Sequence, residues 1–253
     1  MAARRCATVR RMTVDLNCDL GEGTAWDGEL MPLITSANIA CGAHAGDLAT
    51  MKKAVELAHR NHVGVGAHPG FADREHFGRR EIPLTPRELA RQVIAQIEAL
   101  RELGPVRHVK PHGALYNLAA RERGVADVIA NAVLSVDPSL ILFGLANSQL
   151  VAAGRAKGLP VAEEVFADRT YQANGSLTPR TEAAALISTE AAAVAQVRRM
   201  VHDGVVIAVD GTTVRVRADT VCVHGDGERA VALAQALRHA LEADGVTLRP
   251  FGA

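Results

Sequence analysis

The sequence predicts an α/β protein built on parallel strands, with either a β/α barrel or a doubly wound sheet as its core. The main observation is the order of elements, because strand candidates alternate with helix candidates along the chain, and seven strand candidates lie outside one β-hairpin. No change of composition marks a linker in the 253 residues, a length sufficient for one large α/β domain. Hydrophobic residues make up 48% and aromatic residues only 3%, so the core is built from Ala, Val, Leu and Ile.

The first strand candidate, residues 13–18, has an unusual polar face. Its side chains alternate, with Val14 and Leu16 on one face, and the polar side chains on the other face are Asp15, Asn17 and Asp19. Strands that helices cover on both sides are normally apolar throughout. We therefore expect further polar groups next to these carboxylates.

The next two strand candidates lead into histidines. Residues 36–41 run into a glycine-rich turn that contains His44, and residues 64–67 end at His68. Asp47 is placed to cap a helix that extends to about Asn61. The loop over residues 71–83 is long and charged, and loops of this length in compact domains are usually functional or disordered.

The remaining elements continue the alternation. The clearest helix follows Thr85, which forms a capping-box pattern with Glu88 and precedes a proline at the first helical position. Further helices are expected over residues 125–136, 147–157, 189–201 and 228–243, and strands over 140–144, 161–166 and 220–223. Residues 205–216 predict a β-hairpin, with strands 205–209 and 213–216 joined by an Asp-Gly turn.

One stretch, residues 107–112, carries both a cation and an imidazole. If it forms a strand, Lys110 and His112 point to the same side. Burying a cation and an imidazole costs free energy unless each has a hydrogen-bonding or charged partner, or takes part in function. The alternative is an edge strand with a solvated polar face.

Side chains that can act in catalysis or binding lie at the end of most strand candidates. They are Asp15, Asn17, Asp19 and Glu22, then His44 and Asp47, His68, Lys110 and His112, Asp168 and Arg169, and finally His224 and Asp226. In a parallel barrel these strand ends meet on one rim, where active sites are built. One histidine at a strand end is usually a satisfied hydrogen-bonding residue, but four that converge with carboxylates predict a functional site.

This rim could work with or without a metal ion. Histidine and aspartate can hold a divalent metal, with His44, His68 and His112 as candidate ligands. The same groups with Lys110 could instead supply a general base and an oxyanion stabiliser. The sequence has no HExxH, GxSxG or CxxC motif, and it has no GxxxxGK[ST] or GxGxxG phosphate loop. Any nucleotide is therefore bound by an unfamiliar arrangement or by another protein.

Composition limits the partners and the compartment. Lys+Arg and Asp+Glu are both 28, which argues against a broad surface for nucleic acid or acidic membranes. No apolar run approaches the roughly 20 residues that span a bilayer. The four cysteines are far apart in the sequence, which favours free thiols in the cytoplasm. The basic residues 1–11 predict a disordered extension rather than a secretory signal or a mitochondrial-type presequence, and residues 12–253 predict one domain.

Several motifs resemble one known family, the lactam-utilisation family, which is also the family of the 5-oxoprolinase A subunit. The matching stretches, in the family's order, are Asp15–Glu22, Ser36–Asp47, Gly66–Gly70, His108–Asn117, Phe166–Tyr171 and Cys222–Asp226. Less regular stretches are Phe71–Asp73 and Gly175–Arg180, neither of which contains a rim residue. The resemblance runs from about Met12 to the C-terminus.

The resemblance implies a seven-stranded parallel β/α barrel, similar to sugar deacetylases and glycosidases, as the catalytic domain. It also implies ATP-dependent opening of 5-oxoproline to glutamate, with ATP as its Mg²⁺ complex and with two partner subunits, B and C. The catalytic candidates are Asp15, Asp19, Glu22, His44, Lys110 and His112. The substrate-binding candidates are Asn17, His68, Asp168, Arg169, His224 and Asp226.

Two roles follow as hypotheses. Asp19, Lys110 and His112 would orient water and stabilise the developing oxyanion, and Arg169 would pair with the substrate carboxylate. The alternatives are a metal-dependent amide or N-acetyl hydrolase that acts alone, and a non-catalytic subunit that binds substrate or holds its partners together.

Overall fold

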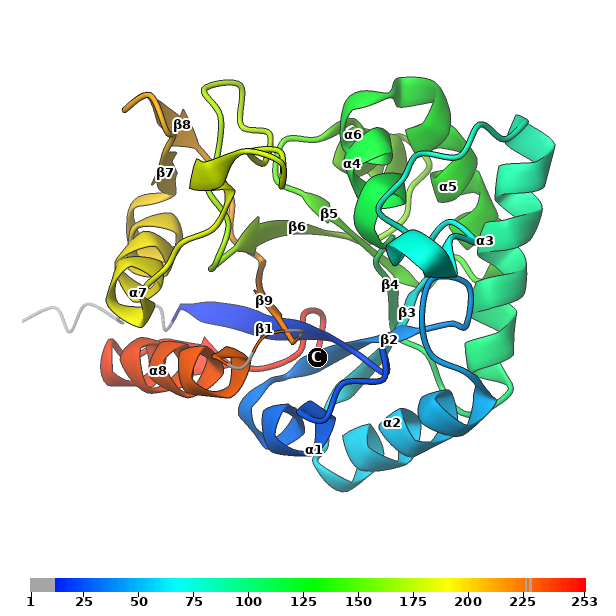
Figure 1. Ribbon diagram of the computed structural model, residues 1–253, viewed down its shortest axis with the longest axis horizontal. Helices are drawn as coiled ribbons and strands as arrows, with labels where there is room; N and C mark the ends of the chain where they lie inside the picture. The colour runs from blue at the N-terminus through cyan, green and yellow to red at the C-terminus, as the bar shows by residue number, and fades with distance from the viewer. Residues whose placement is uncertain (1–11, 226, 228) are drawn as a thin grey trace, which may run out of the picture.

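Seven parallel strands close into a barrel in the computed structural model, which describes residues 12–253 except 226 and 228 (Figure 1). The strands are β1 Thr13–Leu20, β2 Ser36–Ala40, β3 Gly64–His68, β4 His108–Val109, β5 Ile141–Leu145, β6 Val161–Phe166 and β9 Thr220–His224. Each pairs in parallel with the next, and β9 pairs with both β6 and β1, which closes the ring. The predicted seven-stranded parallel barrel is confirmed. The extension predicted over residues 1–11 and the site residue Asp226 lie outside the described residues.

Helices surround this barrel on its outer side (Figure 1). They are α1 Asp27–Leu30, α2 Leu48–Arg60, α3 Pro86–Arg101, α4 Gly113–Arg121, α5 Arg123–Val136, α6 Gln149–Ala156, α7 Glu190–Arg198 and α8 Ala230–Ala243. Short 3-10 turns cover Met31–Leu33, Arg74–His76 and Ala183–Ala185, and a π-turn at Arg199–Asp203 extends α7. The capping boxes at Asp47 and Thr85 are both formed. None of the helices in the described part of the chain is long and apolar enough to cross a bilayer.

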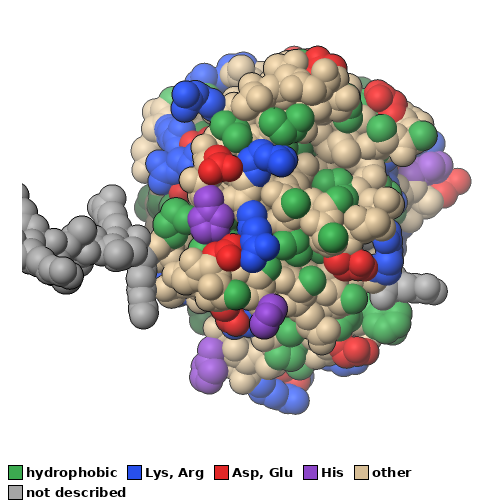
Figure 2. Space-filling view, turned by 90° about the vertical axis from the view of Figure 1, so that its left-hand side faces the viewer, with side chains coloured by type: hydrophobic (Ala, Val, Ile, Leu, Met, Phe, Trp, Pro, Cys, Tyr) green, Lys and Arg blue, Asp and Glu red, His purple; other side chains and the backbone are tan. Residues whose placement is uncertain are grey.

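A small antiparallel hairpin and one short strand complete the fold. The hairpin strands are β7 Val205–Ile207 and β8 Thr213–Arg215, as predicted. The last strand, β10 Thr247–Leu248, was not expected from the sequence; it pairs with Thr13 and Val14 at the start of β1. The face near α7, α8 and the hairpin carries acidic and basic side chains close together (Figure 2), among them the ion pair of Arg198 with Asp244.

The stretch after β4 differs from the prediction in one respect. Pairing with β5 covers only His108 and Val109, although the backbone stays hydrogen-bonded to the β3 side through Lys110 N–H and His112 N–H. Residues from Gly113 then form α4, a helix that the sequence did not predict because it starts at a glycine. Gly113 has a φ of +53°, which most residues avoid. The turn therefore brings Lys110 and His112 to the barrel end just before a helix begins.

The interior of the barrel is polar. Barrels of this type are normally filled with layers of branched apolar side chains, whereas here the inward side of β1 carries Asp15, Asn17 and Asp19, all buried. Asn17 donates hydrogen bonds to Glu164 of β6 and to Thr220 of β9. The polar face predicted for β1 thus meets polar groups from other strands, and this network forms the base of the site.

Candidate active site

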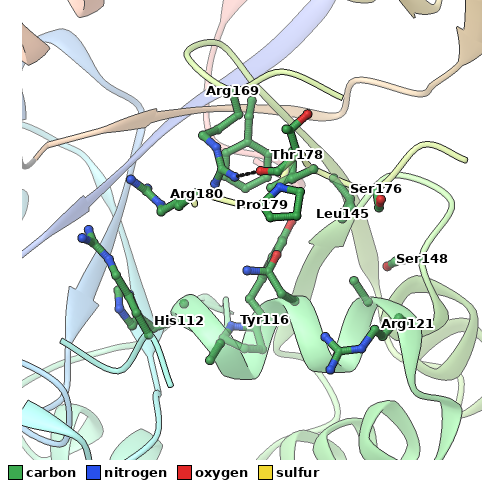
Figure 3. Close-up of a pocket in the computed structure, with 18 of the residues that line it drawn as sticks. His112, Tyr116, Arg121, Leu145, Ser148, Arg169, Ser176, Thr178, Pro179 and Arg180 are labelled. Atoms are coloured by element: carbon green, nitrogen blue, oxygen red, sulfur yellow. Dashed lines mark hydrogen bonds between the residues drawn. The ribbon is translucent and has the colours of Figure 1, made fainter. Parts of the chain in front are cut away.

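A cavity of about 770 Å³ opens at the carboxyl ends of the strands (Figure 3). Its charged and imidazole-bearing lining includes Asp19, Glu22, His68, Lys110, His112, Arg169, Arg180 and His224. In Figure 3, Tyr116 and Arg121 of α4 lie on one side of this cavity, and Arg169 and Arg180 on the other. The rim predicted from the strand ends is therefore a real cavity, and most of the predicted residues line it.

Lys110 crosses the barrel interior and meets two carboxylates. Its Nζ lies 2.8 Å from Oδ1 of Asp19 and 2.9 Å from Oε1 of Glu164. The same ammonium lies 3.0 Å from Sγ of Cys222 and 3.3 Å from Oδ1 of Asn17. Only 2% of the lysine side chain is exposed, so this is a buried ion cluster. Lys110 has two carboxylate partners, and they offset the free-energy cost of burying its ammonium.

The pKa values in this cluster follow from the charges. Burial works against the Lys110 ammonium, but the Asp19 carboxylate, with Cys222 and Glu164, outweighs it and holds the pKa of Lys110 well above its usual value. Burial also opposes the charge on Asp19, yet His68 and Lys110 hold the pKa of Asp19 well below its usual range. Burial raises the pKa of the Cys222 thiol well above its usual value despite the nearby ammonium. The site thus contains a cation, a carboxylate and a neutral thiol.

Three histidines and a glutamate form a second cluster beside the first. Nε2 of His44 lies 3.3 Å from Oε1 of Glu22, and Nδ1 of His112 lies 3.5 Å from the same oxygen. Nδ1 of His112 also lies 2.9 Å from Nε2 of His68. Burial lowers the pKa of His44 and that of His112, so both imidazoles are held neutral. The four side chains come from different loops and strand ends and could hold a metal ion.

The long loop over residues 71–83 packs its backbone against these histidines. The carbonyl of Phe77 lies 2.9 Å from Nε2 of His112. Gly78 has a φ of +64°, and a Cβ there would lie 2.7 Å from Cβ of His44 and 2.9 Å from the His112 ring. The glycine allows the chain to approach the imidazoles closely at this point.

His224 stands across the cavity in a separate pair. Its Nδ1 lies 2.8 Å from Oδ2 of Asp168 and 2.9 Å from the other carboxylate oxygen. Burial opposes ionisation of Asp168, but His224 outweighs it and lowers the pKa of Asp168. An imidazole oriented through Nδ1 by a carboxylate leaves Nε2 available for proton transfer.

Of the predicted site residues that the structure describes, Asp15, Asn17, His44 and Asp168 do not line the cavity, whereas Arg169 does. Asp15 is at the deep end of β1, where it accepts hydrogen bonds from Thr35 and Thr220. Asn17 lies under the Lys110 cluster. Arg169 lines the cavity, but its guanidinium donates to the backbone carbonyls of the 178–185 segment.

Several residues that shape the site were not singled out from the sequence. Glu164 is the most important, since it is fully buried against Lys110. Its signal was visible, because the β6 sequence places two glutamates in the middle of an otherwise apolar strand. Asn38 bridges Asn17 and Asp19. The stretch Gly175–Arg180 was expected to contribute no residue to the rim, but it lines the cavity and includes Arg180.

The fold and the site define this chain as a β/α-barrel protein with a charged, histidine-rich mouth, and comparison with known proteins places it in a family. The pattern of the LamB/YcsF family matches residues 14–253. The 5-oxoprolinase A subunit of Geobacillus thermodenitrificans is 52% identical over 246 residues, which cover 94% of this chain and 96% of that protein. The corresponding protein of Brevibacillus brevis, which has the same name, is 50% identical over 246 residues, covering 93% and 97%.

Solved structures agree with this match. The crystal structure of a lactam utilization protein from Thermus thermophilus has 44% sequence identity and a TM-score of 0.89, covering 95% of this chain and all of that one. A protein from Agrobacterium tumefaciens, at 13% identity and a TM-score of 0.59, shares the fold alone. The chain therefore belongs to the LamB/YcsF family, and the resemblance seen in the sequence motifs is confirmed.

Proposed function

We propose that this chain is the lactam-binding catalytic component of an ATP-dependent 5-oxoprolinase, and that it acts in the cytoplasm together with two partner subunits, B and C. The observation that carries the proposal is the match, along nearly the whole chain, to relatives named as the A subunit of 5-oxoprolinase. The cavity supports it, because about 770 Å³ falls within the ~300–1,000 Å³ range of small-molecule sites. The site's convergent cation, carboxylates and imidazoles suit chemistry at an amide carbonyl.

The reaction breaks the bond between the ring carbonyl carbon and the ring nitrogen. Phosphorylation of the lactam oxygen by ATP, as its Mg²⁺ complex, makes the carbonyl carbon reactive toward water. One water adds to that carbon and the carbon–nitrogen bond breaks, which leaves an acyl phosphate that a second water hydrolyses. The overall reaction consumes 5-oxoproline, ATP and two waters, and it releases glutamate, ADP and inorganic phosphate. We place the lactam, or its phosphorylated form, in the cavity of this chain and leave ATP binding to the complex as a whole.

The residues have distinct proposed roles. His224, oriented by Asp168, accepts a proton from the attacking water through Nε2. Asp19 orients that water, and Lys110, held 2.8 Å away, fixes the carboxylate and stabilises negative charge. The same ammonium stabilises the developing oxyanion, and His112, whose Nε2–H is held by the Phe77 carbonyl, lines the cavity and positions the lactam.

The substrate carboxylate is assigned to Arg180 rather than to Arg169. Arg169 donates from Nη2 and Nε to the carbonyls of Thr178 and Ala185, which fixes its guanidinium against the 178–185 segment. Arg180 lines the same cavity, where its guanidinium is not held by a backbone carbonyl of the described residues in the way that Arg169 is. A guanidinium in that position can form a bidentate contact with a carboxylate.

The test is a glutamate-release assay with 5-oxoproline and ATP, run with this chain alone and with the B and C subunits added. We expect glutamate and ADP only in the full mixture, and loss of release with Asp19→Ala or His112→Ala. Absence of glutamate in every combination would overturn the assignment. Full activity of both variants in the complex would remove the proposed roles of these residues.

A second candidate function is a metal-dependent amide or N-acetyl hydrolase that acts alone. The cluster of Glu22, His44, His68 and His112 favours it, because such donor sets hold catalytic metals. It predicts hydrolysis without ATP that chelators abolish. A non-catalytic, substrate-capturing subunit is the third possibility, and it predicts that cavity variants leave catalysis intact while surface variants break the complex.

A further inference from the structure

The second cluster packs three imidazoles around one small space. The rings of His44 and His112 stack with centroids 3.7 Å apart and planes 2° apart. His68 stands edge-on to both, at 5.5 Å and 4.8 Å. All three side chains are at least nine-tenths buried, and one oxygen of Glu22 lies among them. The hydrogen-bond partners of these closely packed rings show which ring nitrogens carry a proton.

Backbone carbonyls fix the protons on two of the rings. Nδ1 of His68 lies 2.7 Å from the carbonyl oxygen of Lys110, and Nε2 of His112 lies 2.9 Å from that of Phe77. A carbonyl oxygen only accepts hydrogen bonds, so each of these nitrogens carries the hydrogen. In the neutral rings, the opposite nitrogens, Nε2 of His68 and Nδ1 of His112, therefore carry lone pairs.

These two lone pairs point at each other. Nε2 of His68 and Nδ1 of His112 are 2.9 Å apart. A carboxylate oxygen of Asp19 lies 3.4 Å from the first nitrogen, and Oε1 of Glu22 lies 3.5 Å from the second. Acceptors gathered in this way repel one another unless a positive centre lies between them. That centre is either an extra proton or a metal cation.

The spacing favours a metal cation. Zinc bound tetrahedrally at about 2.0–2.1 Å from each ligand separates neighbouring ligand atoms by about 3.3 Å. Three of the six distances between the ligand atoms here are 3.3 Å for His44 to Glu22, 3.5 Å for His112 to Glu22 and 2.9 Å for His68 to His112, and all six are within 4.8 Å. Anchoring the far N–H of a histidine on a carbonyl is also how proteins orient metal-binding imidazoles.

A proton fits the cluster less well. An extra proton would make one of these buried rings a cation in close contact with the others, since the rings of His44 and His112 stack with centroids 3.7 Å apart.

We propose that Oε1 of Glu22 and ring nitrogens of His44, His68 and His112 bind one first-row divalent cation of the zinc class. Three nitrogens with one carboxylate oxygen suit such an ion better than Mg²⁺ or Ca²⁺, which prefer oxygen ligands. Glu22, His68 and His112 line the cavity, so a small ligand can reach the ion. A bound ion of this kind polarises a carbonyl oxygen. The proposal goes beyond the proposed function, since the site does not depend on which substrate the cavity accepts.

Another group of possible ligands is less suited to a cation. Asp19, Cys222 and His224 also bring donor atoms within 4.8 Å of one another. However, the Lys110 ammonium lies 2.8 Å from Asp19 and 3.0 Å from Cys222, so it already supplies the positive charge there. A second cation in that place would be repelled.

Metal binding by the purified chain tests the proposal without any activity assay. The protein is treated with a chelator, reloaded with Zn²⁺ or Co²⁺, and analysed for metal content and for the visible absorption of tetrahedral Co²⁺. We expect stoichiometric binding by the wild type and a rise in its thermal midpoint with Zn²⁺. The His68→Gln, His112→Gln and Glu22→Gln variants should bind at least about 10- to 100-fold more weakly.

Two controls locate the ion. His202→Gln removes an exposed histidine on the surface and should leave metal binding unchanged. His224→Gln removes a donor of the other group and should also leave it unchanged. Circular dichroism verifies that each variant is folded, and the Co²⁺ spectrum of the wild type reports histidine ligation even if a variant fails to fold.

The outcomes separate the metal site from its rivals. Failure of the folded wild type to bind either ion saturably would overturn the proposal and assign the extra positive charge to a proton shared within the cluster. Binding that survives His68→Gln and His112→Gln but is lost in His224→Gln would overturn it as well. Stoichiometric binding without any glutamate release in the full complex would keep the metal site and reject the proposed function instead.

Discussion

Asp19 and Lys110 form a buried ion pair that joins the two clusters of the site. Oδ1 of Asp19 lies 2.8 Å from the lysine Nζ, and the other oxygen of the same carboxylate lies 3.4 Å from Nε2 of His68. One carboxylate therefore contacts both the ammonium and the imidazole cluster. Changes on either side are expected to reach the other through it.

Removal of the Lys110 charge should both destabilise and inactivate the protein. Lys110→Met leaves Asp19 and Glu164 as buried, uncompensated carboxylates, and breaking a buried ion pair typically costs about 3–5 kcal/mol. We expect a loss of unfolding free energy of this order in urea and loss of glutamate release. The matched control is Lys110→Met with Glu164→Gln, which should recover part of the stability but no activity. Wild-type stability of the single variant would contradict the prediction.

The two arginines of the cavity wall should behave differently. Arg169→Gln leaves the buried Thr178 carbonyl without its donor, at about 1–3 kcal/mol, so it should reduce stability; the Ala185 carbonyl keeps the N–H of Thr170. Arg180→Gln should keep stability within about 0.5 kcal/mol and raise the KM for 5-oxoproline at least about tenfold, a loss of about 1.4 kcal/mol. Unfolding curves and steady-state kinetics separate the two effects. A stable Arg169→Gln variant with a raised KM would restore Arg169 as the partner of the substrate carboxylate.

Asp15 should make stability depend on pH. Burial raises its pKa from 3.8 to about 6, although Thr35 and Thr220 donate hydrogen bonds to it. Because the folded state disfavours the ionised form, the stabilising contribution of Asp15 is complete below about pH 4 and is lost as the pH rises through about 6. A shift of about 2 pKa units corresponds to about 3 kcal/mol.

The Asp15→Asn variant isolates this contribution, since its side chain does not ionise. Its unfolding free energy relative to wild type should rise by about 3 kcal/mol between about pH 4 and pH 7. Urea unfolding at several pH values measures the difference, and Asp203→Asn on the surface is the control. A difference that stays constant over this range would show that Asp15 ionises normally in the folded protein.

Gly66 should be irreplaceable for steric reasons. A Cβ at this position would lie 2.0 Å from Nε2 of His108, whose ring stacks on Phe143. We expect Gly66→Ala to cost at least about 1–3 kcal/mol in unfolding free energy, the usual range for overpacking. Gly124→Ala in α5, where a Cβ would meet nothing within 4 Å, is the control and should be neutral or slightly stabilising. Equal stabilities of the two variants would contradict this view of the barrel interior.

The barrel could be predicted because its signals are local. The alternation of polar and apolar side chains in β1 and the capping pattern at Thr85 can be read along the chain, and both are present in the structure. The extent of β4 and the start of α4 could not, because they depend on pairing with β5 and on the positive φ of Gly113.

The sequence predicts which residues belong to the site, but it does not predict how they are arranged. Strand ends of a parallel barrel converge, so Asp19, Lys110 and His112 were expected together and lie together. The choice between Arg169 and Arg180 depends on which backbone carbonyls fold back on each guanidinium, and sequence spacing contains no such information. The carbonyl contacts of His68 and His112 likewise exist only once the loop over residues 71–83 is in place.

The short strand β10 has a practical consequence for how this protein can be handled. Thr247 pairs with Thr13, so both ends of the described chain lie at the amino end of the barrel, opposite the cavity. Labels or surface attachment close to Thr13 or Thr247 should therefore leave the mouth open. The same geometry makes the protein suitable for circular permutation, with new ends placed in an exposed loop.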